Sequence, residues 1–296
     1  MRTRLLTIGL LGFAAGYAAL RFVPASAPLP TSSFSETAPL VVAHRGGMGL
    51  WPEHTLYAFR AALDLGTDVL ELDVRRSADE QLVVFHDADL ARTTNGEGPL
   101  KARTVAELSR LDAGHHFSLD GGNSFPYRGR GLTIPTLAEI LRELPKARLS
   151  IELKEETQVA AESLCAMVKR RGAGERVLVS SFHQAPVDTF RARCPRVATA
   201  ATPGEAWRFY LASGLGLTNL VQPKAAVFFV FERLGPFQLV TRRLVSQAAA
   251  LNLPIYVWGA ESDDAVRTLL DAGVAGITTD RPDRLLALLR HKGRPM

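Results

Sequence analysis

The chain alternates short apolar runs of strand length with segments whose apolar residues recur at helical spacing, about eight times between residues 40 and 289. This alternation is typical of a parallel β/α architecture, and eight repeats favour a closed barrel over an open sheet. Such a barrel commonly occupies ~250 residues as one domain, so a chain of 296 residues needs no further boundary. We therefore predict an α/β fold, a (β/α)8 TIM barrel.

The pattern also predicts where the elements and the insertion lie. Residues 88–135 have no repeating pattern beyond one short helix at 105–111, so we predict an irregular insertion after the second barrel strand, in the role of a lid, binding loop or small subdomain. Predicted strands cover residues 40–43, 69–75, 82–87, 148–154, 177–182, 197–201, 220–223, 255–258 and 276–280. Predicted helices cover 54–65, 137–144, 158–171, 187–193, 205–213, 242–250, 263–272 and 284–289.

The N-terminus resembles an export signal in outline. Arg2 and Arg4 precede an apolar run from Leu5 to Leu20, and a Pro/Ser/Ala-rich stretch follows. The run is long for a signal peptide and short for a ~20-residue span. We predict a signal sequence or membrane anchor at 1–23, a linker at 24–39 and a catalytic barrel at 40–296, with the barrel outside the cytoplasm (periplasmic or secreted) and associated with the membrane through residues 1–23. A buried soluble helix is the alternative for residues 5–20.

Composition limits the partners and the redox chemistry. The net charge of +5 comes from scattered basic residues, so we expect mild anion preference and no nucleic-acid binding. Cys165 and Cys194 have no metal-ligand spacing, and we predict two buried thiols, with a disulfide as the alternative in an oxidising compartment.

Residues 225–240 are unusually apolar and aromatic; buried core is the simpler interpretation, and an exposed patch that meets lipid is the alternative. The sequence makes no prediction of oligomeric state.

Ionisable side chains gather where predicted strands end. Residues 41–43 lead into His44, Arg45 and two glycines, which let the backbone approach a ligand, and the 82–87 run ends in a second histidine, His86. Glu71 and Asp73 share one face of their strand, and Glu152 and Lys154 share one face of another. Because active sites of such barrels lie at the carboxyl ends of the strands, we expect these groups to meet there, with Trp258 nearby.

The chemistry follows from the residue types. Three carboxylates suit a hard divalent cation, Ca²⁺ or Mg²⁺. An arginine and a lysine neutralise a phosphate, and two histidines share proton removal and proton donation. The combination predicts cleavage of a phosphodiester.

An ordered series of motifs resembles the glycerophosphodiester phosphodiesterase family over about residues 40–290. The motifs are His44-Arg45-Gly46, Pro52-Glu53-His54-Thr55, Glu71-Leu72-Asp73-Val74, Phe85-His86-Asp87, Ile151-Glu152-Leu153-Lys154, Ser180-Ser181-Phe182, Val257-Trp258 and Thr279-Asp280-Arg281-Pro282. The resemblance implies His44 and His86 as general acid and base, Arg45 and Lys154 as phosphate ligands, and Glu71, Asp73 and Glu152 as ligands of Ca²⁺ or Mg²⁺. It also implies attack by the neighbouring glycerol hydroxyl through a cyclic phosphate.

Four more residues are predicted to lie near the metal or the substrate. We expect Glu53 and His54 at the edge of the metal or behind its ligands, and Phe182 and Trp258 in contact with the substrate. His54 departs from the family, which usually has asparagine there, and a histidine charge would vary with pH.

Three functions remain open at this point. The first is metal-dependent hydrolysis of glycerophosphodiesters to glycerol 3-phosphate and an alcohol. The second is the same chemistry on lysophospholipids at the membrane, because the 120–141 stretch resembles the insertion of longer relatives, some of which act on lysophospholipids. The third is a catalytically silent extracytoplasmic binding protein.

Overall fold

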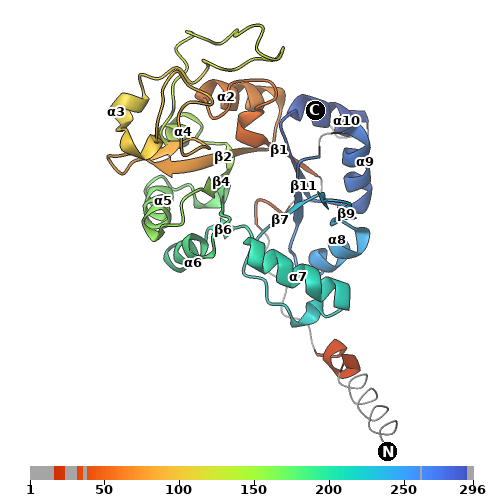
Figure 1. Cartoon of the computed structure of the whole chain (residues 1–296). Helices are drawn as coiled ribbons and strands as arrows, with labels where there is room; N and C mark the ends of the chain where they lie inside the picture. Colours follow the sequence, from red (N-terminus) through yellow and green to blue (C-terminus); the bar gives the residue numbers. More distant parts are fainter. Residues whose placement is uncertain (1–16, 24–31, 36–38, 261, 292–296) are drawn as a thin grey trace, which may run out of the picture.

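The computed structural model describes residues 17–23, 32–35, 39–260 and 262–291, and it contains a parallel barrel with surrounding helices (Figure 1). The barrel strands are β1 Leu40–Ala43, β2 Val69–Arg76, β4 Arg148–Leu153, β5 Val177–Ser180, β6 Ala198–Thr199, β7 Phe228–Phe231, β10 Ile255–Trp258 and β11 Gly276–Thr279. The helices that follow them are α2 Leu56–Leu65, α4 Leu137–Glu143, α5 Gln158–Arg170, α6 Gln184–Arg193, α7 Pro203–Leu215, α8 Arg242–Ala249, α9 Asp263–Ala272 and α10 Pro282–His291.

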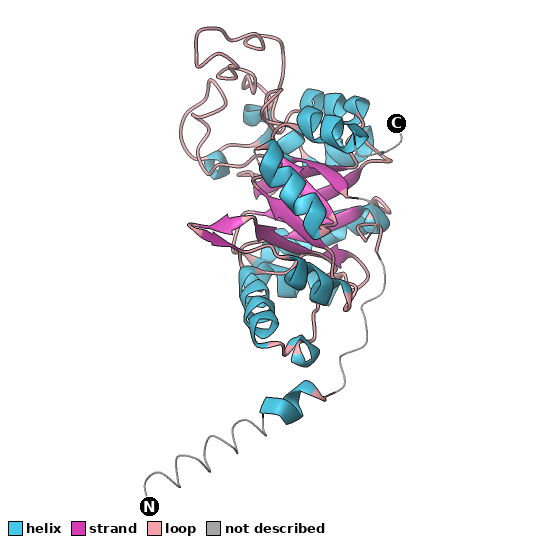
Figure 2. Cartoon of the chain, turned by 90° about the vertical axis from the view of Figure 1, so that its right-hand side faces the viewer, coloured by secondary structure: helices cyan, strands magenta, loops and turns pink. Residues whose placement is uncertain are grey.

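The eight strands close into a ring. Hydrogen-bonded neighbours follow the order β6-β5-β4-β2-β1-β11-β10-β7, and all these pairs are parallel. The two ends meet through hydrogen bonds from Ala226 N to Thr199 O (2.7 Å) and from Ala201 N to Val227 O (2.9 Å). The helices lie outside the strands (Figure 2), so the predicted (β/α)8 architecture is confirmed.

Local sequence signals explain where the helices begin. A threonine or serine hydroxyl accepts a hydrogen bond from a backbone N–H of the first helical turn and replaces the missing intrahelical acceptor. Five of the helices that follow barrel strands, α2, α4, α7, α8 and α9, begin in this way, at Thr55, Thr136, Thr202, Thr241 and Ser262. At these five positions the chain enters its helix through a capped turn at the mouth of the barrel.

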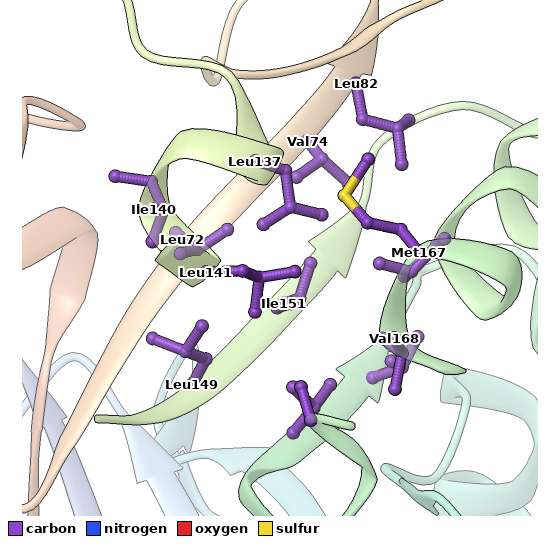
Figure 3. Close-up of a cluster of buried hydrophobic side chains, with 14 of the residues drawn as sticks. Leu72, Val74, Leu82, Leu137, Ile140, Leu141, Leu149, Ile151, Met167 and Val168 are labelled. Atoms are coloured by element: carbon purple, nitrogen blue, oxygen red, sulfur yellow. The ribbon is translucent and has the colours of Figure 1, made fainter. Parts of the chain in front are cut away.

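The outer face of β2 and β4 explains why acids face the interior. Leu72, Val74, Leu149 and Ile151 point outward and pack under α4 and α5, where Leu137, Ile140, Leu141, Met167 and Val168 complete an apolar layer (Figure 3). Because side chains alternate across a strand, the residues between them turn inward. Outward packing thus forces Glu71, Asp73 and Glu152 toward the barrel axis.

The opposite end of the barrel is closed by apolar packing. Phe34 is fully buried against inward-facing Val42 and Tyr256, and the Tyr256 hydroxyl donates to the Phe34 carbonyl at 2.8 Å. This part of the predicted linker therefore packs against the barrel. Water is excluded from the end opposite the ionisable groups.

Two predicted strands differ from the structure. The 82–87 run forms the shorter strand β3 (Leu82–Val84), which pairs antiparallel with β2 and lies outside the ring. Residues 220–223 do not form a strand: a 3-10 turn, η4 (Thr218–Leu220), precedes an irregular segment that includes Pro223, and the barrel strand is β7 instead. Proline lacks the N–H that a central strand needs, which explains the second error.

The prediction of two free thiols is wrong. Cys165 in α5 and Cys194, which directly follows α6, form a disulfide. The two helices are sequential neighbours around the barrel and bring residues 29 positions apart to the same place. The separation in sequence gave no sign of this contact.

The insertion between β3 and α4 contains little regular structure. It has one 3-10 turn, η2 (Leu100–Ala102), and one short helix, α3 (Val105–Leu108). A small apolar cluster that includes Phe85, Leu90, Leu100, Leu108 and Ile134 anchors it beside β3.

In the described part of the chain, no helix has the length and apolar character needed to cross a membrane. The signal or anchor predicted at residues 1–23 lies outside the described residues except for 17–23.

Candidate active site

The corner after β1 carries an unusual backbone. Residues 44–46 form the 3-10 turn η1 (His44–Gly46), in which Arg45 has φ +50° and Gly46 φ +83°. Left-handed backbone is uncommon for a residue with a side chain and is retained where surrounding contacts hold it. Here the Arg45 N–H donates to Glu71 Oε2 at 2.9 Å. A side chain at Gly46 would place its Cβ 2.9 Å from the Phe59 ring, so this position requires glycine.

Three buried carboxylates meet inside the barrel mouth. Glu71, Asp73 and Glu152 each present an oxygen within 4.8 Å of the others, and they are at most 4% exposed. Glu71 Oε1 has no hydrogen-bond partner among the described residues. Three convergent carboxylates with an unpaired buried oxygen match the oxygen ligands that Ca²⁺ and Mg²⁺ prefer.

Positive groups surround one member of this cluster. Lys154 Nζ lies 3.0 Å from Asp73 Oδ1 and 2.7 Å from Glu152 Oε1. Arg45 Nε lies 3.6 Å from Asp73 Oδ2. The predicted phosphate ligands Lys154 and Arg45 therefore lie beside the predicted metal ligands.

Burial and mutual repulsion affect the three carboxylates differently. Burial raises the pKa of Glu71 well above its ordinary value, and repulsion by Asp73 and Glu152 raises it further. Burial and Asp73 also raise the pKa of Glu152, although Lys154 opposes this. Burial alone would raise the pKa of Asp73, but His54, Lys154 and Arg45 outweigh it and hold that pKa low. A divalent cation would relieve the repulsion at Glu71 and Glu152, so the residues present fit such a metal.

The first histidine is oriented by an aspartate from the last strand. His44 Nδ1 lies 2.5 Å from Oδ1 of Asp280, which follows β11. A carboxylate only accepts, so Nδ1 carries the proton of this bond and Nε2 is the free nitrogen. Nε2 lies 4.0 Å from Glu71 Oε2, and the Trp258 ring packs edge-on against the imidazole at a centroid distance of 5.2 Å. His44 therefore presents Nε2 at the edge of the acidic cluster.

The second histidine, His86, reaches the mouth of the barrel because β3 runs antiparallel to β2. Pairing with β2 returns the chain toward the acids, and the Phe85 N–H donates to the Asp73 carbonyl at 3.0 Å. His86 follows directly, with Nδ1 2.5 Å from Asp87 Oδ1. Burial lowers the pKa of His86, and the hydrogen bond to Asp87 opposes that shift. Both histidines thus use Nδ1 to contact an aspartate and leave Nε2 free.

A chain of ion pairs connects His86 to Arg45. Arg92 binds Asp87 and also donates to both oxygens of Glu53, at 2.8 and 2.7 Å. Glu53 in turn accepts from Arg45 at 2.9 Å. Burial would raise the pKa of Glu53, but the hydrogen bond from Arg92 and the neighbouring positive charges lower it to about 2. Glu53 therefore pairs with Arg45 and Arg92 and is not part of the three-carboxylate cluster.

His54 lies directly behind a predicted metal ligand. It is 3% exposed, its Nε2 lies 2.8 Å from Asp73 Oδ2, and its backbone is left-handed with φ +60°. Asparagine and histidine are among the few side chains that adopt this backbone, which explains how one replaces the other. Burial lowers the pKa of His54 despite the nearby Asp73, so the neutral ring donates from Nε2 at neutral pH. Its Nδ1 has no partner among the described residues.

An apolar pocket of about 270 Å³ opens beside the acids. Glu152, Phe182 and Trp258 are among the residues that line it, so the two predicted substrate contacts both border it. Most of its wall comes from α7, β7 and the segment after β7, which includes the hairpin of β8 (Arg233–Leu234) and β9 (Phe237–Gln238): Pro203, Ala206, Trp207, Tyr210, Phe228, Phe229, Val230, Phe231, Leu234 and Leu239. The apolar 225–240 segment is therefore partly core, at Phe228 and Val240, and partly exposed, at Phe231 and Phe237.

The structure adds four residues to which the sequence reasoning gave no role. Asp280 and Asp87 orient the histidines, Arg92 links Asp87 to Glu53, and Trp207 lines the pocket. A carboxylate directly after His86, and another directly after a strand, were the available signals for the two aspartates. Arg92 and Trp207 lie in an irregular loop and on a helix, where no pattern distinguished them.

Comparison with known proteins identifies the family of the chain. Residues 44–284 match the model of the glycerophosphoryl diester phosphodiesterase family. A glycerophosphodiester phosphodiesterase of Caldanaerobacter subterraneus is 31% identical over 86% of this chain and 99% of its own length. One from Bacillus altitudinis is 33% identical over 84% of this chain and 97% of its own length.

Solved structures agree with both fold and family. An Oleispira antarctica phosphodiesterase in complex with the product sn-glycerol-3-phosphate has a TM-score of 0.69 and 26% identity, and the match covers 86% of this chain and 97% of that one. A glycerophosphoryl diester phosphodiesterase domain from Mycobacterium tuberculosis has a TM-score of 0.74 at 24% identity, over 86% of this chain and 99% of that one, and shows the shared fold. With the match over residues 44–284, the chain belongs to the glycerophosphoryl diester phosphodiesterase family.

Proposed function

We propose that this enzyme hydrolyses glycerophosphodiesters to glycerol 3-phosphate and an alcohol, with a divalent cation, Ca²⁺ or Mg²⁺, at its acidic cluster. The observation that carries the proposal is the pair of histidines beside three buried carboxylates, each with Nδ1 fixed by an aspartate. Glu71, Asp73 and Glu152 would hold the cation. When bound, it supplies positive charge that stabilises the phosphate oxygens as negative charge builds up on them.

The residues of the chain account for binding and proton transfer. Arg45 and Lys154 carry the positive charge that binds the phosphate. One histidine takes the proton of the glycerol 2-hydroxyl at Nε2 as that oxygen attacks phosphorus, and the other gives a proton to the departing alcohol oxygen. The resulting cyclic phosphate is opened by water with the two proton transfers reversed. Asp280 and Asp87 keep each Nε2 free for these transfers.

A second substrate class is favoured by the apolar pocket. The pocket begins at Glu152 and Trp258 and continues between α7 and β7, so the group attached to the phosphate can extend into apolar surroundings. A volume of about 270 Å³ is near the lower end of ligand pockets. Lysophospholipids carry an acyl chain that would gain from such burial. We propose them as an alternative substrate.

Two substrates and two metals test the proposal together. Purified protein, freed of metal by a chelator, is assayed on glycerophosphocholine and on lysophosphatidylcholine, each with Ca²⁺ or Mg²⁺ added back. We expect no turnover without metal and release of glycerol 3-phosphate from glycerophosphocholine when metal is restored. Turnover of the lipid alone would replace the first substrate by the second, and full activity in chelator would refute the metal site.

We also propose an extracytoplasmic location. The disulfide between Cys165 and Cys194 supports it, because disulfides persist mainly in oxidising compartments. The basic and apolar N-terminal sequence supports it independently. N-terminal sequencing of the protein recovered from cell fractions tests both the location and the cleavage: recovery from the cytoplasm with a reduced Cys165–Cys194 pair would refute the proposal.

A further inference from the structure

Large apolar side chains are exposed next to the pocket. Trp207, Leu211 and Leu215 follow one face of α7 at intervals of four residues and are 48%, 61% and 56% exposed. Phe231, Leu234 and Phe237 on β7 and the β8–β9 hairpin are 52%, 52% and 69% exposed. We call these six residues the α7–hairpin surface. Clusters of exposed apolar residues mark sites of interaction with proteins or membranes.

This surface is continuous with the mouth of the pocket. Trp207, Phe231 and Leu234 belong to both, since each lines the pocket and is about half exposed. Leu211 and Leu215 extend the surface along α7, away from the pocket. Whatever covers the surface therefore also covers the entrance for the group attached to the phosphate.

The N-terminal segment points to the occupant. The described residues 17–23 lie at the far end of α7 (Figure 1), where the Tyr17 hydroxyl donates to the Leu215 carbonyl. Asn219 donates to the carbonyls of Leu20 and Val23, at 2.9 and 2.8 Å. The sequence before this contact is the apolar run that starts at Leu5 after two arginines. The part of the chain with membrane-anchor character thus joins the barrel at one end of the α7–hairpin surface.

The charges beside the surface suit anionic lipid. Arg208 on α7 and Arg233 on the hairpin are exposed. Arg233 donates to Gln238 Oε1 and to the Pro236 carbonyl. Both acceptors are neutral, so neither compensates the positive charge of Arg233. Basic residues beside exposed aromatic and aliphatic side chains are the composition that binds membrane surfaces.

We propose that the α7–hairpin surface docks on an anionic lipid bilayer, with the apolar pocket opening toward the membrane. The N-terminal segment holds the barrel close, and Trp207, Leu211 and Phe237 enter the boundary between head groups and acyl chains. This docking requires no turnover, so its test is independent of the proposed phosphodiesterase activity. A second copy of the chain is the competing occupant, and the same variants distinguish the two.

Tryptophan fluorescence tests the contact directly. The full chain is reconstituted in vesicles of phosphatidylcholine and phosphatidylglycerol, with and without brominated acyl chains, which quench tryptophans that reach them. We expect the wild type to lose at least twice as large a share of its emission as Trp207→Phe, because Trp51 and Trp258 then remain as the only emitters. Equal quenching of the two proteins would overturn the proposal.

A charge-matched pair of variants separates docking from a general effect of charge. Leu211→Glu with Phe237→Glu should reduce quenching at least twofold, because each carboxylate disfavours burial in lipid. Leu119→Glu with Val159→Glu adds the same charge at exposed residues outside the surface and should leave quenching unchanged. If the first pair leaves quenching intact but converts a dimer to a monomer in analytical ultracentrifugation, the surface is an interface between copies and the proposal is wrong.

Discussion

The mouth of the barrel has two unlike sides. The side formed by β1, β2 and β4 holds three buried carboxylates with a lysine and an arginine beside them, and both Lys154 and Arg45 lie close to Asp73. The side formed by α7, β7 and the hairpin is apolar, open and continuous with exposed aromatic residues. Trp258 borders both, since it contacts His44 and lines the pocket. In the proposed reaction, the polar side holds the phosphate and the apolar side accepts the group that the phosphate carries.

The two sides are expected to respond differently to mutation. Charged groups need fixed partners when buried, so the polar side tolerates little change. Burial of apolar surface is favourable without a fixed geometry between the groups, so the pocket on the other side can change in size and shape. We expect variants on the polar side to affect every substrate and variants on the apolar side to discriminate between substrates.

The largest expected effect comes from the histidines. His44→Ala and His86→Ala should each reduce kcat/KM by ~10²–10⁴-fold on glycerophosphocholine and lysophosphatidylcholine alike, because each removes a proton-transfer group. Steady-state assays on both substrates measure this. His183→Ala, on a half-exposed histidine preceding α6, is the matched control and should retain activity. Loss on one substrate only would contradict the shared polar side.

The next effect concerns the residue behind Asp73. His54→Ala removes the 2.8 Å partner of Asp73 Oδ2 and should weaken the affinity for the divalent cation by ~10–100-fold. His54→Asn introduces the residue that the family resemblance implies at this position, fits the left-handed backbone and keeps a donor, so it should stay within a few-fold of wild type. Isothermal titration with Ca²⁺ and Mg²⁺ measures both. Equal loss in the two variants would show that the ring itself, rather than its donor, is required.

A pocket variant should discriminate between substrates. Ala206→Trp places a large side chain on the pocket wall at a helical position. It should lower kcat/KM for lysophosphatidylcholine about tenfold more than for glycerophosphocholine, which corresponds to ~1.4 kcal/mol of lost apolar contact. Ala212→Trp, also on α7 but outside the pocket, is the control. Equal losses on both substrates would break the distinction between the two sides.

The smallest expected effect is a shift in pH dependence. Burial lowers the pKa of His86 and the hydrogen bond to Asp87 raises it, so Asp87→Asn should lower the pKa further. The limb of the kcat/KM profile that belongs to His86 then moves to lower pH: the acidic limb if His86 is the base, the alkaline limb if it is the acid. Asp89→Asn, on an exposed neighbour, should move neither limb. A shift to higher pH would contradict the His86–Asp87 contact.

Local patterns predicted the architecture well because they record local physics. Alternation of Leu70, Leu72 and Val74 with Glu71 and Asp73 follows from a strand packed on one face only. Proline at 223 was a local signal against the strand predicted at 220–223, but other differences arose where no local rule applies. The direction of β3 depends on its pairing with β2, and the apolar 225–240 segment divided between core and surface according to what α7 and α8 left uncovered.

The sequence alone determined the (β/α)8 class and the residue types at the strand ends, because strand and helix periodicities and the alternation of side chains are properties of the chain. Only the tertiary structure decided which groups became partners. Asp280 reaches His44 across 236 residues because β11 and β1 are hydrogen-bonded neighbours, and Cys165 reaches Cys194 because their helices pack together. Closing the barrel fixes which strands are adjacent, and adjacency in space, rather than in sequence, makes the site.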